Sequence, residues 1–435
     1  MLEFTAARFR RLARNDFLRY AAITFGAQSS VNLLGFVFHM IVTRRLGVAG
    51  YGSLSALLNG FSVLIVPATI LATVVARYAA EFRALDDAGR LRMLVVRVGS
   101  LLGGGAVFTL IVGTLLSSLV ARYLHLDDLL SVVLTAAILA VNLVLVVLRG
   151  ILQGIEDFWA LGLSLLSEGV AKVIVLLAVV QAAWGVDGAL AAWLSGSTLS
   201  LAWTVATLAR RFHPFAASPL HVDFGKLLRT TGCVALAMLC VASLTFSDVV
   251  VVKHVFDARQ AGLYSAASLA GKILFWLVAF VPIVILPRAT HHAMTGRPVR
   301  SILVQALLMV TLPATATLLV FATAPVLIVR TLTGPAFLAA APLLLPYGVA
   351  MTLLAATNTV VLFKIGIHRF AFVAPLIVVA LLELIAIATF HRTPLQVIQI
   401  LIFADAVALI VTLVEIRLPR FAAMPGVGPQ EARAP

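Results

Sequence analysis

The side chains in this chain best able to do chemistry are a few charged groups set inside long apolar stretches. Glu168 and Lys172 lie four residues apart, so on a helix they share one face and can pair. Lys272 holds a similar place in the second half, with Asp248 as a candidate partner. Burying such charges costs free energy unless they are paired with an opposite charge or hydrated. We expect either a self-neutralising pair or two lysines that attract an anion.

Buried carboxyl groups form a second set, which could take up a proton or another cation. Glu383 and Asp405 join Glu168 and Asp248 as candidates for ion coupling. No catalytic, metal or cofactor motif accompanies them: Gly271-Lys272 lacks the upstream glycine of a phosphate-binding loop. The sequence therefore predicts a protein that is not an enzyme and needs no cofactor.

Uncharged polar residues repeat at helical spacing within the apolar stretches. A polar stripe on a membrane helix faces either a neighbouring helix or a water-filled cavity, and the pattern leaves both open. The spacing of Arg149 from the end of its stretch also allows its side chain to reach the surface. The candidate cavity residues of these stripes are Gln28, Asn32, His39, Asn59, Asn142 and Arg149.

The elements that position these residues follow from composition. With 62% hydrophobic and 11% charged residues and a mean hydropathy of +1.09, the chain has more apolar surface than a water-soluble core could hide. The apolar runs do not alternate with polar residues, so they predict helices rather than barrel strands. We predict an all-α polytopic membrane protein. About twelve spans are expected, near residues 20–43, 53–76, 94–120, 129–152, 158–183, 188–209, 228–252, 262–286, 301–323, 338–363, 370–390 and 394–416.

A polar turn recurs at half the chain length. Arg44 to Gly52 lies between the first two runs, and the related stretch from His254 to Tyr264 lies between the seventh and eighth. This repeat predicts two six-helix bundles around a central cavity, as in many secondary transporters. The predicted units are an interfacial amphipathic helix (1–19), an N-terminal bundle (20–212), a linker (213–225), a C-terminal bundle (226–418) and a disordered cytoplasmic tail (419–435).

The formal net charge of +14 is explained by topology. Most of the 32 lysines and arginines fall in loops on one side of the predicted spans, which is the distribution that the positive-inside rule produces. We therefore expect both termini in the cytoplasm and membrane lipids as partners of the basic loops. Nucleic acid is not an expected partner.

Two motifs give the chain a resemblance to a known family. Arg44-Arg-Leu-Gly-Val-Ala-Gly-Tyr-Gly-Ser-Leu54, followed by Val75-Ala-Arg-Tyr-Ala-Ala-Glu81, resembles the N-terminal signature of bacterial polysaccharide-repeat-unit flippases. Those proteins belong to the multidrug/oligosaccharidyl-lipid/polysaccharide (MOP) exporter superfamily. Asp248, Ala261 to Ala267 and Leu286-Pro-Arg288 look like its next signature. The similarity covers about residues 15 to 420.

The resemblance implies two bundles arranged as a V and transport of a lipid-diphosphate-linked oligosaccharide across the bacterial inner membrane. Lys172 and Lys272 would then attract the diphosphate, and polar residues such as Asn32 and Asn59 would contact sugar. Polysaccharide-assembly proteins are candidate partners. Family relatives carry more arginine in the cavity than this sequence does. A multidrug exporter of the same superfamily remains an alternative, and a membrane polysaccharide polymerase or ligase is a third.

Overall fold

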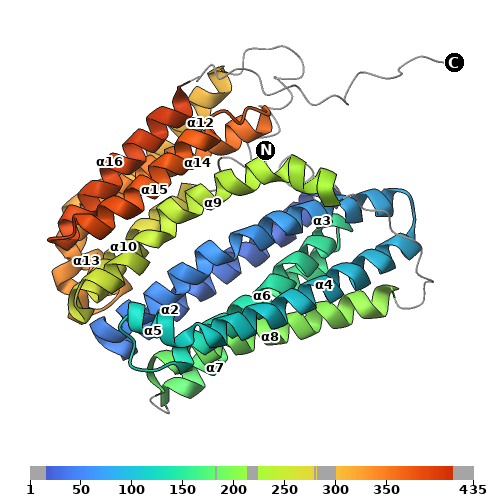
Figure 1. The fold of residues 1–435 in the computed structure, drawn as a ribbon, viewed down its shortest axis with the longest axis horizontal. Coiled ribbons are helices and arrows are strands. Elements are labelled where there is room, and N and C mark those ends of the chain that lie inside the picture. Colours follow the sequence, from blue (N-terminus) through green and yellow to red (C-terminus); the bar gives the residue numbers. More distant parts are fainter. Residues whose placement is uncertain (1–15, 182–183, 213–223, 279–280, 282–299, 415–435) are drawn as a thin grey trace, which may run out of the picture.

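The computed structural model describes residues 16–181, 184–212, 224–278, 281 and 300–414. Within them, every regular element is a helix, as the uniformly apolar runs predict (Figure 1). Other predicted features lie partly or wholly outside these residues: the helix at 1–19, the linker at 213–225, the tail at 419–435 and the Leu286-Pro-Arg288 motif.

The first half of the chain forms the helices α2 to α8. A single-residue break separates α2 from α3, where Pro67 stands in the first turn of the new helix and cannot continue the preceding one. The bounds are α2 Asp16–Leu64, α3 Val66–Ala84, α4 Ala88–Leu115, α5 Ser117–Tyr123, α6 Leu130–Gly154, α7 Phe158–Gln181 and α8 Gly185–Phe212.

The second half forms α9 to α16 and one short 3-10 helix, η1. Helix α13 lies between two predicted spans, because it is too short to give a membrane signal, and η1 overlaps the start of the span predicted at 338–363. The bounds are α9 Phe224–Val255, α10 Ala258–Val278, α12 Arg300–Thr323, α13 Pro325–Leu332, η1 Pro335–Ala340, α14 Ala341–Gly366, α15 Val373–Thr389 and α16 Pro394–Leu413.

The described helices agree with the predicted spans. Ten stretches are long and apolar enough to cross a membrane, and the first of them, Gly26–Ala84, contains two arms that meet at Gly47. The shorter apolar helix α15 adds another. With the two arms taken separately, the described part of the chain accounts for twelve spans. The all-α polytopic fold is therefore confirmed.

The helices form two groups. Helices α2 to α8 pack mainly on one another, as do α9 to α16, and the groups lie on opposite sides of the molecule in Figure 1. The main connection between them is α2, which packs against both α9 and α10. We call the two groups the first lobe and the second lobe.

The predicted turn at Arg44 to Gly52 centres on one residue. Gly47 has a φ of 66° inside an otherwise continuous run of helix, and a glycine adopts this left-handed conformation without a steric penalty. The turn is thus much tighter than the nine-residue stretch that the sequence suggested. It places Tyr51 in the interior, only 1% exposed, with its ring edge-to-face on Phe337 of the second lobe at 5.9 Å.

The two repeated turns meet each other across the lobes. A Cβ atom added at Gly262 would lie 2.0 Å from the carbonyl oxygen of Val48, and one added at Gly52 would lie 2.9 Å from the nitrogen of Gly262. Only glycine fits such an approach of two backbones. Nearby, the guanidinium of Arg44 donates to the carbonyl oxygen of Thr331 in the second lobe at 2.8 Å. The lobes are therefore in contact at the end that carries the turns.

This contact predicts that Gly262→Ala weakens the joined lobes, because its methyl group would collide with backbone that cannot rotate away. Overpacking of this kind typically costs about 1–3 kcal/mol. We expect a lower apparent melting temperature in detergent, measured by intrinsic fluorescence. Gly99→Ala on α4 is the control, since its added Cβ would meet nothing within 4 Å. Equal melting temperatures for the two variants would contradict the prediction.

Candidate functional site

Lys172 is a buried cation whose neighbours are aromatic rings. Lys172 lies on α7 and is only 6% exposed. Its ammonium lies 4.2 Å from the ring centre of Trp193 and 5.1 Å from that of Phe38. It makes no hydrogen bond or ion pair with any residue that the structure describes. Ring faces attract a cation without neutralising it. Its positive charge is therefore uncompensated by close contact with a carboxylate.

Lys272 is held differently, by polar groups from both lobes. Its ammonium, on α10, donates to the side-chain oxygen of Asn59 on α2 at 2.5 Å. The nearer carboxylate oxygen of Asp248, on α9, lies 3.6 Å away. The pairing of Lys272 with Asp248 that the sequence suggested is confirmed as an ion pair, and Asn59 is an additional partner from the other lobe.

Both lysines lie beside the second arm of α2. Lys272 bonds directly to Asn59. Two residues further on, Phe61 packs edge-to-face on Trp193 at 6.1 Å, and the ring of Trp193 also lies against the ammonium of Lys172. Because residues two apart on a helix point to different sides, the two predicted cations approach α2 from different sides.

Glu168 has a different partner from the one that its spacing suggested. It forms an ion pair with Arg149 of α6 at 2.8 Å, not with Lys172. The reason is that a spacing of four residues only places two side chains on one face, whereas the guanidinium of Arg149 enters from another helix with several donors. The predicted Glu168–Lys172 pair is wrong in this respect.

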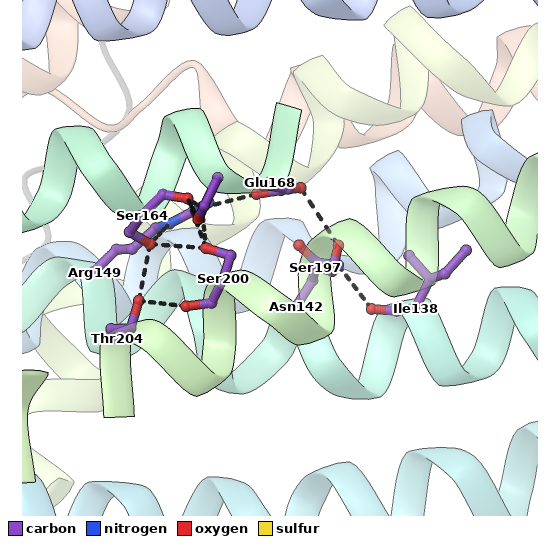
Figure 2. A network of polar contacts seen from close by, with 9 residues as sticks. Ile138, Asn142, Arg149, Ser164, Glu168, Ser197, Ser200 and Thr204 are labelled. Carbon is purple, nitrogen blue, oxygen red and sulfur yellow. Dashed lines mark hydrogen bonds and ion pairs between the residues drawn. The ribbon is translucent and has the colours of Figure 1, made fainter. Parts of the chain in front are cut away.

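Figure 2 shows the network around this ion pair. Arg149 also donates to the hydroxyl and the carbonyl oxygen of Ser164 on α7 and to the hydroxyl of Ser200 on α8, all within 2.9 Å. The hydroxyl of Ser164 bonds to those of Ser200 and Thr204 at 2.8 Å. These contacts clamp α6, α7 and α8 together. Arg149 does not extend to the surface, because its donors have acceptors inside the lobe.

Asn142 belongs to the same network. Its amide donates to the hydroxyl of Ser197 at 3.0 Å and to the carbonyl oxygen of Ile138 at 2.9 Å. Ser197 in turn lies 3.4 Å from the carboxylate of Glu168. Between these residues α7 and α8 approach closely, since a Cβ at Gly196 would lie 2.5 Å from the carbonyl oxygen of Glu168. The network fixes the backbone from which Lys172 projects, one turn beyond Glu168.

Asp248 is the centre of a polar cluster in the second lobe. One carboxylate oxygen accepts hydrogen bonds from the hydroxyls of Tyr264 at 2.9 Å and Tyr347 at 2.6 Å. Tyr347 also bonds to the hydroxyl of Ser268 at 2.9 Å. No local pattern in the sequence distinguishes Tyr347 or Ser268 from other residues of the apolar runs. Tyr264 belongs to the repeated turn in the sequence, but that pattern does not indicate its bond to Asp248.

Glu383 and Asp405 lie near Asp248 and interact with it electrostatically. They are 2% and 1% exposed, and in the part of the chain that the structure describes none of their carboxyl oxygens has a hydrogen-bond partner. Among the described residues, no group of three or more His, Cys, Asp or Glu has the geometry to hold a metal ion. The two acids are therefore buried polar groups without structural partners.

The remaining predicted cavity residues lie along the first arm of α2. Gln28 donates to the side-chain oxygen of Asn32 at 3.1 Å, and both residues are exposed. His39 is half-buried, with one ring nitrogen 3.4 Å from the hydroxyl of Tyr51. On the second arm, the polar stripe beyond Asn59 becomes exposed at Thr69 and Thr73 of α3. Polar surface thus increases away from the joined turns.

The comparisons with known proteins agree with this architecture. A family profile described as "Polysaccharide biosynthesis protein" matches residues 17–291. No curated protein sequence matches the chain.

Solved structures show the same fold. An inward-facing multidrug resistance MATE family transporter of the MOP superfamily shares 14% identity, with a TM-score of 0.74 over 88% of this chain and 92% of that one. The lipid II flippase MurJ, in an inward closed conformation, shares 14% identity, with a TM-score of 0.67 over 90% of this chain and 86% of that one. A eukaryotic MATE transporter shares 15% identity, with a TM-score of 0.60 over 94% and 95%.

The network of Figure 2 predicts that Arg149 and Glu168 depend on each other. Removing one partner of a buried ion pair typically costs about 3–5 kcal/mol, because the other charge stays behind without compensation. Arg149→Met should therefore lower the apparent melting temperature strongly, and the double variant with Glu168→Leu should recover part of the loss. Arg122→Ala serves as control, since this exposed arginine bonds only within its own helix. Additive losses in the double variant would contradict the coupling.

Proposed function

The chain belongs to the family of polysaccharide biosynthesis proteins, and on this premise we propose that it translocates a lipid-diphosphate-linked oligosaccharide across the bacterial inner membrane. The chain is a multi-pass membrane transporter with the fold of the MOP superfamily. Transport would proceed by alternating access, with the lobes parting first at one end and then at the other. The product would serve surface polysaccharide biosynthesis, and polysaccharide-assembly proteins would be partners.

The burial of two lysines beside α2, Lys172 from the first lobe and Lys272 from the second, is the observation that carries this proposal. A diphosphate bears charges that two ammonium groups can contact from opposite sides. Lys172 has no carboxylate contact to give up, so it would attract the anion most strongly. A cationic drug would meet repulsion at the same place.

The exposed polar side chains of α2 would contact the glycan or order water around it. Gln28 and Asn32 lie on the arm where polar surface is accessible, and His39 and Asn59 continue toward the lysines. Arg149 and Asn142 would act indirectly, because their donors are used within the first lobe to hold the helix that carries Lys172. The hydroxyl groups of a sugar need hydrogen-bonding side chains of this kind.

Coupling to a cation gradient would fall to the second lobe. Glu383 and Asp405 are buried without hydrogen-bond partners, and a buried carboxylate needs either a bound cation or a proton. Glu168 and Asp248 are less suited to exchange a cation, because Glu168 is ion-paired with Arg149 and Asp248 accepts from two tyrosines and faces the ammonium of Lys272. Both chain ends would lie in the cytoplasm, with the joined turns facing outward.

The buried acids also favour a second candidate, a multidrug exporter of the same superfamily that binds cationic drugs at carboxylates. This alternative predicts drug resistance on expression and no effect on surface polysaccharide. A polysaccharide polymerase or ligase is less well supported, since the solved structures that share the fold are transporters and flippases.

The lysines give the direct test of the flippase proposal. Replacing both Lys172 and Lys272 by Ala should reduce glycan export at least tenfold in a cell that lacks its own flippase, because the anionic headgroup loses both cations. Surface polysaccharide would be measured alongside the amount of protein in the membrane. Lys364→Ala, at the end of α14, is the control. Unchanged export in the double variant would refute the electrostatic role.

The acids give a separate test of coupling. Glu383→Gln and Asp405→Asn preserve shape but remove the group that would exchange a cation. We expect export to become insensitive to collapse of the proton or sodium gradient, with binding of the lipid-linked substrate retained. The assay is uptake into proteoliposomes under imposed gradients of each ion. If both variants respond to the gradients as the unaltered protein does, these acids do not couple transport.

A further inference from the structure

The hydrogen bond between Lys272 and Asn59 joins the two lobes inside the membrane. Asn59 lies seven residues beyond Gly52 on α2, and Lys272 lies ten residues beyond Gly262 on α10. At 1.5 Å of rise per residue, the bond is about 10 to 15 Å deeper than the glycine contact between the turns. It is thus a polar contact between the lobes that lies deeper than the turns, and it must break when that end opens.

The amide of Asn59 is oriented for this bond. Its nitrogen donates to the carbonyl oxygen of Ser55 at 2.7 Å and reaches the Ser55 hydroxyl at 3.2 Å. The amide oxygen is left to accept from the ammonium of Lys272 at 2.5 Å. Because a carbonyl can only accept and an ammonium can only donate, both ends of the amide have their proper partners. Asn59 is therefore a fixed acceptor on the first lobe.

Asp248 supplies an unused acceptor on the second lobe. Its Oδ2 atom accepts from two tyrosines, but its Oδ1 atom, in a fully buried side chain, has no hydrogen-bond partner. This atom lies 3.6 Å from the Lys272 ammonium. Charge-assisted hydrogen bonds of this type measure about 2.7–2.9 Å. A movement of the ammonium by about 1 Å would complete the bond.

We propose that Lys272 is a two-position latch between the lobes, bound to Asn59 when the turns are joined and passed to Oδ1 of Asp248 when they part. The proposal rests on the transport function proposed above and specifies how its lobes are released. A buried ammonium that lost Asn59 with no replacement would carry a large penalty. A hydrogen bond to Oδ1 of Asp248 would remove most of that penalty, so the lobes can separate and rejoin.

The latch also gives the two lysines different tasks. Lys172, held only by ring faces, keeps its charge for an anionic ligand in either position of the lobes. Lys272 always has an acceptor from the protein, either the amide or the carboxylate. An anionic headgroup near Lys272 would compete with Asn59 and favour the parted state.

The test measures the separation of the lobes in the full chain without substrate. Spin labels at Ser118→Cys and Arg259→Cys, both exposed near the joined turns, report the distance across the lobes by pulsed electron resonance in lipid nanodiscs. The background carries Cys233→Ser, which removes the exposed cysteine. Asn59→Ala should raise the ratio of parted to joined populations about tenfold, because the joined state alone loses a hydrogen bond to a charged group.

Asp248→Asn, added to Asn59→Ala, should return the ratio toward its original value, since the parted state then loses its charged acceptor. In a Lys272→Met background, Asn59→Ala should have no effect, and this arm does not depend on the folding of the Asp248 variant. Ser62→Ala, which removes a bond within α2 only, is the control. An unchanged ratio in Asn59→Ala, or a shift that persists without Lys272, would overturn the latch.

The outcome is independent of the flippase test. If the distances respond as expected while glycan export is insensitive to the lysines, the latch stands and the proposed substrate is wrong. If export depends on Lys172 but the distances do not respond to Asn59→Ala, the substrate stands and the latch is wrong.

Discussion

A charge placed inside an apolar membrane helix is costly unless it has a partner, and this constraint shapes the interior of the protein. Arg149 meets it with a carboxylate and three serine acceptors, and Lys272 meets it with one group from each lobe. Lys172 meets it only with ring faces. Because the partners come from different helices, the same contacts that satisfy the charges also fix how the helices pack.

The two halves of the repeat use this constraint in different ways. The first lobe concentrates its polar contacts in a satisfied network between α6, α7 and α8, which makes it a rigid support (Figure 2). The second lobe gathers three buried carboxyl groups and two tyrosines, and leaves several oxygens without hydrogen bonds. The polar groups of the first lobe are thus satisfied by one another, whereas the second lobe holds carboxyl oxygens that no described group bonds.

The lobes contact each other at two glycines, one in each of the repeated turns. Gly52 and Gly262 let two backbones approach at the turns, and the polar bond of Lys272 with Asn59 lies deeper along the same pair of helices. A larger side chain at either position would hold these helices apart. The two glycines allow van der Waals contact between the backbones, but they supply no side-chain hydrogen bond. The hydrogen bonds of Arg44 with Thr331 and of Lys272 with Asn59 add directional contacts to this packing.

The sequence alone determined the class of protein and the positions of its spans. Long apolar runs can only be helices in lipid, and their lengths match the bilayer, so most predicted runs agree with the described helices within a few residues. The second and third runs, predicted at 53–76 and 94–120, differ more, because α3 continues to Ala84 and α4 begins at Ala88. The repeated glycine and tyrosine turns were likewise readable, because positive φ and close approach need specific residue types. The buried charges were also found, since a lone Lys or Glu is conspicuous in an apolar run.

Only the tertiary structure decided which charge meets which partner. The spacing of Glu168 and Lys172 predicted a pair, but Arg149 from another helix supplies more donors and takes the carboxylate. The bond of Lys272 with Asn59 spans 213 residues of sequence, and the hydroxyl of Tyr347 reaches Asp248 from a different helix. Helical periodicity specifies the face on which a side chain lies. Its partner depends on how that face is rotated and packed against its neighbours, which no local pattern in the sequence encodes.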